Sequence, residues 1–313
     1  FLFSITDSIV RKWNNTKAVC RRWIIGYLLG MNRNCEVSLK SIGYKVKDGI
    51  YTQHYSRHDR VLNFCADNLV ISVCATGICS GPYRIVLECD KLSHIESIAI
   101  DKGTLIINGQ QRIYYPKDKT YRHAYSGAIA AGDEHWERLV QSFAHFVKHA
   151  HPNSIIALIN SESGEGSFDF ALKTSFSEGM RHLRQGNYTE AVRCFRHRGM
   201  GLSPAGDDFL IGFVLATKWL ELVRKKELSK ITEIIIHESE VNNALIRTFM
   251  CQAAELDLDA DWAEWLEALA NVDVPLLPSL EALMKHGASS GADKLSGFFA
   301  ACEVIGNLKA IRI

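Results

Sequence analysis

Short runs of β-branched and aromatic residues fill the chain from about residue 61 to residue 115. Gly, Asn, Asp or Pro residues separate these runs, as in Ser80-Gly-Pro and Asn108-Gly109, and this punctuation is typical of strands joined by turns. Asn-Gly between two such runs predicts a hairpin. We expect a helix over about 7–29 and strands over six segments: 61–64, 69–74, 83–87, 95–100, 104–107 and 112–115.

The pattern changes after about residue 121, where apolar residues recur at spacings of three and four. This period predicts amphipathic helices, and only 155–159 resembles a strand there. We expect helices over nine segments: 133–149, 168–185, 188–197, 206–224, 226–237, 239–255, 259–270, 278–286 and 291–304. Strands followed by helices indicate an α+β fold with segregated parts.

The length of 313 residues exceeds what one hydrophobic core usually serves, and this predicts two domains. We expect a β-rich N-terminal domain over 1–120, where short strands at this spacing favour a small barrel or a sandwich. A mainly α-helical C-terminal domain over 121–313 would follow. The boundary would fall near Pro116-Lys-Asp-Lys-Thr.

Composition argues against several classes of protein. Lys and Arg total 36 against 35 Asp and Glu, a formal net charge of +1, so the basic excess of a dedicated nucleic-acid binder is missing. No apolar run approaches the ~20 residues that cross a bilayer. The nine cysteines are scattered and form no CxxC pair, which favours free thiols in a reducing compartment. We therefore expect a cytoplasmic protein with no nucleic-acid and no membrane partner.

One segment differs from the rest of the chain: Arg198-Gly-Met-Gly-Leu-Ser-Pro-Ala-Gly-Asp-Asp. Gly199, Gly201 and Gly206 lie close together in it, as in a loop that turns sharply or approaches another group closely. An amphipathic helix follows at once, with Ser203 suited to the N-cap and the next residue, a proline, to the first helical position. Free N–H groups at such a helix start attract anions.

Asp207 and Asp208 at this helix start have two interpretations. They can be ordinary caps that satisfy the helix dipole, or they can bind a cation or the N–H groups of a ligand. Plain caps are far commoner than binding sites, but a plain cap does not need three nearby glycines. The aspartates therefore remain candidates for a binding site.

Residues 291–301 repeat residues 206–216 after a shift of 85 positions, with six of the eleven residues identical. Asp208 and Asp293 are among the identities, and aspartate is not a core residue. Helical periodicity alone therefore does not account for the agreement.

A further identical pair, Gly212 and Gly297, lies inside predicted helices, where glycine costs about 1 kcal/mol relative to alanine. Another group must approach them closely, most simply each other. We hypothesise that the two helices cross at these glycines and that their loops face one shared pocket. The alternative is an internal duplication kept only for packing. The polar residues expected to line the pocket are Ser203, Asp208, His286, Ser289, Ser290 and Asp293.

These two segments resemble the signatures of a known family. Gly199-Met-Gly-Leu-Ser-Pro-Ala-Gly-Asp-Asp-Phe-Leu-Ile-Gly is similar to G-x-G-L-[ST]-P-[SA]-G-D-D-[FL]-L-x-G, and Gly287-Ala-Ser-Ser-Gly-Ala-Asp-Lys-Leu-Ser-Gly is similar to G-H-S-S-G-x-D-x-L-x-G. Both signatures are those of the oxamate carbamoyltransferase subunit AllH-like family. The sequence departs from the second signature at Ala288, where the family commonly has His, and has His286 just before the motif.

The resemblance implies a subunit of a multi-protein carbamoyltransferase in allantoin breakdown. That enzyme converts oxalurate and phosphate into oxamate and carbamoyl phosphate, so the implied partners are small anionic substrates and the other carbamoyltransferase subunits. The implied catalytic residues are Asp207, Asp208 and Asp293, which would accept ureido or carbamoyl N–H groups. The residues implied to hold the substrate are Arg198, Gly199, Gly201, Ser203, Gly206, His286, Ser289, Ser290 and Gly291.

Two other functions stay open. The chain can be a non-catalytic scaffolding or regulatory subunit whose glycine motifs pack helices or dock a partner. It can also be a metal-dependent hydrolase in which Asp207, Asp208 and Asp293 bind Mg²⁺ through oxygen ligands, although no spaced His/Asp ligand set accompanies them. We expect no cofactor unless this last alternative holds, and the sequence leaves a homo-oligomer open.

Overall fold

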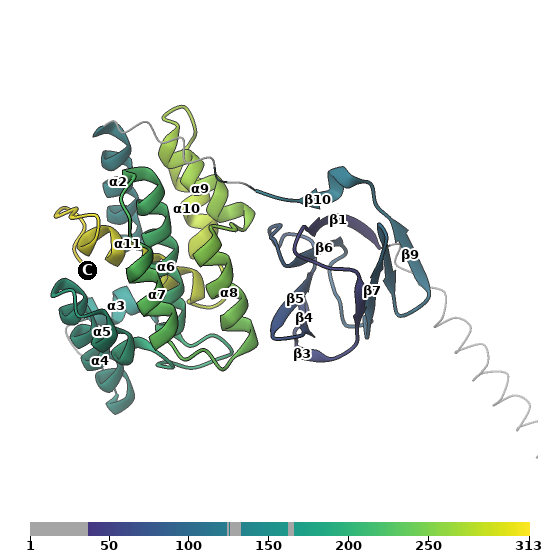
Figure 1. The fold of residues 1–313 in the computed structure, drawn as a ribbon, viewed down its shortest axis with the longest axis horizontal. Coiled ribbons are helices and arrows are strands. Elements are labelled where there is room, and N and C mark those ends of the chain that lie inside the picture. Colours follow the sequence, from purple (N-terminus) through teal and green to yellow (C-terminus); the bar gives the residue numbers. More distant parts are fainter. Residues whose placement is uncertain (1–36, 124, 126–132, 162–165) are drawn as a thin grey trace, which may run out of the picture. The chain divides into compact units, whose positions relative to one another are not determined.

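The structure is a computed structural model that describes residues 37–123, 125, 133–161 and 166–313. Strands occupy the N-terminal part of these residues and helices the C-terminal part, which confirms the α+β fold (Figure 1). The helix expected over 7–29 lies outside the described residues. Of the helices that are described, none is both long enough and apolar enough to cross a membrane.

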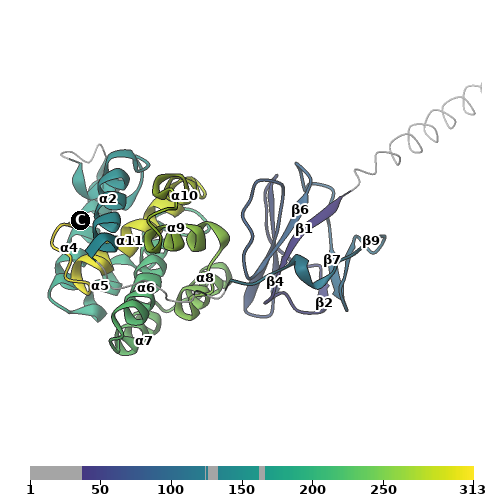
Figure 2. The same cartoon turned by 90° about the horizontal axis from the view of Figure 1, so that it is seen from above.

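The strands form two open sheets. The larger has the strand order β10-β1-β6-β5-β4-β3 and the smaller the order β2-β7-β8-β9. Both remain open at their edge strands, so the described strands form no closed barrel, which was one of the two expected arrangements (Figure 2). The strands are β1 (Ser38–Gly43), β2 (Gly49–Tyr51), β3 (His54–Arg57), β4 (Val61–Ala66), β5 (Leu69–Cys74), β6 (Arg84–Glu88), β7 (Ile98–Asp101), β8 (Thr104–Ile107), β9 (Gln111–Tyr114) and β10 (Thr120–Tyr121).

Strands β8 and β9 form the predicted hairpin. Ile107 pairs with Gln111, and the connecting Asn108 and Gly109 have φ values of 52° and 70°. Asn and Gly adopt this left-handed conformation more easily than other residues. The remaining predicted strands also form. Four strands were not predicted, because β2 and β10 have only three and two residues and because β1 and β3 are rich in polar residues.

A short 3₁₀ turn and then the helices follow the strands, and most of the helices lie where the periodicity predicts them. The largest difference is at α8, predicted from residue 239, which begins at Ala244 because the Asn243 side chain caps it by accepting hydrogen bonds from two backbone N–H groups. These elements are η1 (Lys117–Lys119), α2 (Asp133–His149), α3 (Ile155–Asn160), α4 (Ser167–Arg184), α5 (Tyr188–Phe195), α6 (Ala205–Arg224), α7 (Ser229–Glu238), α8 (Ala244–Glu255), α9 (Ala260–Ala270), α10 (Leu276–Met284) and α11 (Ser290–Val304).

The strand predicted over 155–159 is wrong, because these residues form helix α3. The buried carboxylate of Asp293 accepts a hydrogen bond of 2.8 Å from the Ile155 N–H group and so satisfies a free donor at the start of the helix. This partner lies 138 residues away along the chain. A short apolar run therefore takes the helical form through a contact that local pattern does not reveal.

Helices α6 and α11 run through the core of the helical region. Most residues of both helices are buried, as expected for helices that other elements surround on all sides. On α11, Phe298 and Phe299 pack edge-on against Trp265, with ring centroids 5.0 and 5.9 Å away. The loops that lead into α6 and α11 are therefore anchored on a tightly packed core.

Polar contacts join the strands to the segment between α8 and α9. The Tyr44 hydroxyl donates to Asp257 at 2.5 Å, and the Arg84 guanidinium donates to Asp259 at 2.5 Å. Leu39–Ile313 form one compact unit. The change from strands to helices falls after β10, and the division into domains near residue 120 stays a prediction.

Candidate functional site

The two glycine-aspartate helix starts pack on each other. A Cβ added to Gly212 on α6 would overlap the carbonyl oxygen of Lys294 on α11, and one added to Gly297 would overlap that of Phe209 on α6. Both pairs of residues are related by the same shift of 85 positions, so the contact is reciprocal, as in a twofold-symmetric interface. The predicted packing of the two segments is confirmed.

The same symmetry extends into the preceding loops. The Gly206 N–H donates to the Arg198 carbonyl at 2.8 Å, and the Gly291 N–H donates to the His286 carbonyl at 2.9 Å. Arg198 and His286 therefore occupy equivalent positions in two related helix–loop–helix units. The first loop is longer, because eight positions separate Arg198 from Gly206 and five separate His286 from Gly291.

Asp208 and Asp293 are both fully buried, with an exposed fraction of 0%. Asp208 accepts a hydrogen bond from the Ser203 hydroxyl and lies 3.4 Å from the Lys294 ammonium. Asp293 accepts the hydrogen bond from Ile155 described above. Among the described residues, Asp208 Oδ1 and Asp293 Oδ2 have no hydrogen-bond partner. Each carboxylate therefore keeps one acceptor atom without a hydrogen bond.

Burial raises the pKa of both carboxyl groups. It brings the pKa of Asp293 to about 7, with a further contribution from the negative charge of Asp208. For Asp208, burial raises the pKa against the opposing effects of the Lys294 ammonium and of hydrogen bonds from Ser203 and Ser290. A carboxyl group with a pKa of about 7 is partly protonated near neutral pH, so Asp293 can hold a proton there.

Asp207 faces the preceding loop instead of this pair. Its carboxylate accepts a hydrogen bond of 2.9 Å from the His197 N–H group. It thereby anchors the loop in which Gly199 and Gly201 have φ values of 111° and 95°. The Arg198 side chain at the start of the loop is exposed. These residues shape the loop, and their roles toward a substrate stay predictions.

The predicted N-cap of α6 is wrong by one residue. Helix α6 begins at Ala205 with Pro204 as its N-cap, and the N–H group of Asp208 donates to the Pro204 carbonyl at 3.0 Å. Ser203 instead turns its hydroxyl to the Asp208 carboxylate. At the equivalent start of α11, Ser289 is the N-cap.

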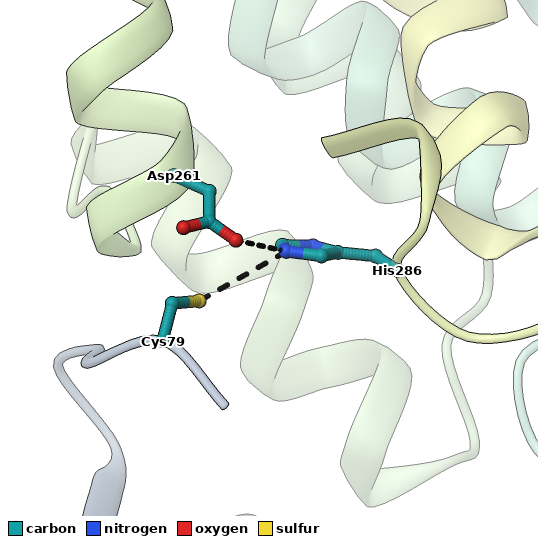
Figure 3. Close-up of side chains that lie close together, drawn as sticks. All are labelled: Cys79, Asp261 and His286. Atoms are coloured by element: carbon teal, nitrogen blue, oxygen red, sulfur yellow. Dashed lines mark hydrogen bonds and ion pairs between the residues drawn. The ribbon is translucent and has the colours of Figure 1, made fainter. Parts of the chain in front are cut away.

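His286 is not brought to the aspartate pair. Its Nε2 atom lies 2.5 Å from an oxygen of Asp261 and 3.9 Å from the sulfur of Cys79 (Figure 3). Neither partner was singled out in the sequence. The shared pocket expected from the sequence and the role of this histidine in substrate binding both stay predictions.

A pocket that is partly open to solvent lies beside Lys294. The Lys294 ammonium faces the Phe249 ring at 4.0 Å and links Asp208 to this pocket. Sequence reasoning missed Lys294, although it directly follows Asp293 in the second motif. The residues that line the pocket are Ile211, Leu215, Phe249, Gln252, Ala253, Asp257, Leu258, Asp259, Trp262 and Lys294.

The geometry does not favour a magnesium site at the helix starts. In the part of the chain that the structure describes, Asp207, Asp208 and Asp293 do not form a group that could share one ion. Lys294 already places a positive charge 3.4 Å from Asp208. The predicted metal-dependent hydrolase therefore gains no support from these three residues.

Comparison with known proteins is informative for the helical region. Residues 197–302 match the family model described as oxamate carbamoyltransferase subunit AllH. This range contains both helix starts and every residue that lines the pocket. No curated protein and no solved structure matches the chain. Residues 197–302 are therefore similar to the AllH family of oxamate carbamoyltransferase subunits.

Proposed function

We propose that the chain is a subunit of an oxamate carbamoyltransferase and that the pocket beside Lys294 binds the oxalurate or oxamate of the reaction. The complete enzyme would convert oxalurate and phosphate into oxamate and carbamoyl phosphate in the cytoplasm. The family match over 197–302 supports the first part. The second part rests on Lys294, whose ammonium contacts the buried Asp208 and lines the pocket.

Lys294 supplies the positive charge that an anionic substrate needs. An ammonium group has three hydrogen-bond donors, and a carboxylate or phosphate that accepts from it forms a charge-assisted bond. Asp208 forms an ion pair with the Lys294 ammonium and is itself inaccessible to solvent. A substrate carboxylate would therefore bind on the pocket side of Lys294.

The lining of the pocket also offers acceptors for N–H groups. Asp257 and Asp259 are carboxylates, which only accept hydrogen bonds when ionised, whereas ureido and amide nitrogens donate. Arg84 holds Asp259 in place at 2.5 Å. A ligand with a carboxylate at one end and N–H groups at the other complements this arrangement, as oxalurate and oxamate do.

In this proposal Asp208 and Asp293 do not contact the substrate. Asp208 sets the position of Lys294, and Asp293 influences the charge of Asp208, since each carboxyl disfavours ionisation of the other. Asp207 keeps its role in the loop. The three aspartates therefore position the groups that contact the substrate.

A scaffolding subunit is the second candidate function, and the glycines favour it. A Cβ at Gly206, Gly212, Gly291 or Gly297 would overlap a backbone carbonyl oxygen of a neighbouring segment. Close helix packing therefore accounts for these glycines without any ligand. If this candidate is correct, the pocket binds none of the substrates.

Ligand-dependent thermal stability separates the two candidates. At about 100 times its Kd, a ligand that binds only the folded chain adds about 2.7 kcal/mol of stability. For a chain of this size, that corresponds to a rise in Tm of roughly 4 °C. Oxamate and oxalurate should produce the rise. Oxalate should produce a much smaller one, because it lacks N–H groups and leaves the pocket carboxylates unpaired.

Replacement of one lysine tests the assigned site. Lys294→Met should abolish the oxamate response, and the raised pKa of Asp208 lets that carboxyl take a proton when its cation is lost. Lys285→Met is the matched control, because Lys285 is exposed at the end of α10 and does not line the pocket. A full response in Lys294→Met, or no response of the wild-type chain to oxamate, oxalurate, phosphate or carbamoyl phosphate, would contradict the proposed pocket.

A further inference from the structure

Three potential metal ligands converge outside the pocket described above. Cys79 lies between β5 and β6, Asp261 lies in the first turn of α9, and His286 lies between α10 and α11 (Figure 3). The sulfur of Cys79, Nε2 of His286 and one carboxylate oxygen of Asp261 all lie within 4.8 Å of one another. All three residues belong to the compact unit Leu39–Ile313.

The geometry distinguishes a metal site from a catalytic Cys-His-Asp triad. In a triad the acid binds one ring nitrogen of the histidine while the other nitrogen faces the nucleophile. Here Asp261 and Cys79 both face Nε2 of His286, at 2.5 and 3.9 Å. The three donor atoms therefore surround a common point, as ligands of one ion do.

We propose that Cys79, Asp261 and His286 bind a divalent transition metal ion, with Zn²⁺ the best match. Zinc accepts sulfur, nitrogen and oxygen ligands together, whereas Mg²⁺ prefers oxygen ligands alone. Typical zinc–ligand bonds of about 2.0–2.3 Å place tetrahedral ligand atoms roughly 3.4–3.6 Å apart. The Cys79–His286 spacing of 3.9 Å is close to this, and the Asp261–His286 spacing of 2.5 Å would widen as the ion replaces their hydrogen bond.

The surroundings of the cluster fit metal binding. One nitrogen of Arg84 lies 2.7 Å from the Cys79 sulfur, and another lies 2.5 Å from Asp259. Hydrogen-bond donors to a coordinating thiolate are usual around metal ions and orient the ligand. The side chains of His286 and Asp261 are 27% and 20% exposed. Solvent can therefore supply the ion and a water molecule as the fourth ligand, as in open zinc sites.

This inference does not depend on the carbamoyltransferase proposal, because none of the three ligands lines the pocket beside Lys294. An ion at this position would connect the β5–β6 turn with α9 and with the loop before α11. It would therefore tie the strand region to the segment that carries the second helix start.

Titration of the metal-free chain with Co²⁺, followed by displacement with Zn²⁺, tests the site. We expect one high-affinity Co²⁺ per chain, a thiolate-to-cobalt charge-transfer band in the near ultraviolet, and loss of that band when Zn²⁺ is added. Cys79→Ser should remove the band and weaken Co²⁺ binding by at least about a hundredfold. Loss of a residue that only orients a metal ligand weakens binding by up to about this factor, so loss of a ligand itself should cost at least as much. Cys65→Ser is the control, because Cys65 is another partly buried free cysteine and is not in the cluster.

His286→Gln provides a second test if Cys79→Ser fails to fold. We expect it to weaken Co²⁺ binding by a similar factor while circular dichroism shows a folded chain. Failure of the wild-type chain to bind one Co²⁺ with thiolate absorption would overturn the proposal. So would a band that persists in Cys79→Ser, or an unchanged affinity in folded His286→Gln.

Discussion

Among single residues, Asp208 and Asp293 are unusual because both carboxyl groups are fully buried. A buried carboxylate is unfavourable unless hydrogen bonds and opposite charge compensate it. Ser203 and Lys294 compensate Asp208, and the Ile155 N–H group compensates Asp293. The compensation is incomplete, since burial still raises both pKa values. Stability should therefore depend on pH through this pair.

Asp293→Asn should change that dependence. Burial raises the pKa of Asp293 from its ordinary value of 3.8 to about 7, so its contribution to stability is fully present below pH 4 and is lost as pH rises through 7. Asparagine keeps an oxygen that accepts from Ile155 but does not titrate. The free energy of unfolding of the variant, relative to wild type, should rise by about 3 kcal/mol between pH 5 and pH 8. Urea unfolding at both pH values measures this, and a difference that does not change with pH would contradict the assigned pKa.

The sequence predicted part of this residue-level picture. The repeat correctly predicted that Asp208 and Asp293 lie at related positions on packed helices, because identity at positions other than core positions carries information beyond helical periodicity. It did not reveal Lys294, since a lysine beside an aspartate usually lies on a solvated surface. The Asp261 and Cys79 partners of His286 were also missed, because three distant segments contribute them and no local spacing marks the cluster.

At the scale of elements, the α6–α11 pair organises the helical region. Gly212 and Gly297 let the two backbones touch, and the reciprocal contacts fix how one helix start faces the other. The positions of Asp208 and Asp293 follow from this packing. A change that separates the helices should therefore reduce stability and disturb the site together.

Gly212→Ala and Gly297→Ala should each lower the free energy of unfolding by about 3 kcal/mol, because the added methyl group overlaps a backbone carbonyl oxygen that cannot move alone. In an open helix, the same substitution would stabilise the chain by up to about 1 kcal/mol. Gly49→Ala is the control, because its Cβ would lie 3.6 Å from the Tyr51 ring. Chemical unfolding measures all three variants. Stability at or above wild type in the α6 and α11 variants would refute the close packing.

Element prediction from sequence succeeded where the periodic signal is long. Helices α6, α9 and α11 begin and end within a residue or two of the predicted bounds, and the Asn-Gly hairpin forms as expected. Failures came from short segments. Helix α3 was mistaken for a strand because a six-residue apolar run fits either structure. The carboxylate of Asp293, which accepts from its first N–H group, lies far away along the chain.

At the scale of the whole molecule, contacts with the strands support the pocket wall. Tyr44 and Lys45, beside β1, bind Asp257, and Arg84 of β6 binds Asp259. Both aspartates line the pocket. The strand region therefore holds in place the acceptors that the proposed substrate requires, a role that its sequence, which carries no recognisable motif, did not predict.

We propose that this chain contributes the Lys294 pocket to an oxamate carbamoyltransferase. The rate of carbamoyl phosphate formation from oxalurate and phosphate, measured with the enzyme reconstituted with its partner subunits, tests this proposal. We predict that Lys294→Met lowers this rate at least about 100-fold, as expected for loss of a charge that stabilises an anionic substrate and transition state. The variant complex should still assemble, and Lys285→Met should keep the wild-type rate. A wild-type rate from an assembled Lys294→Met complex would contradict the account.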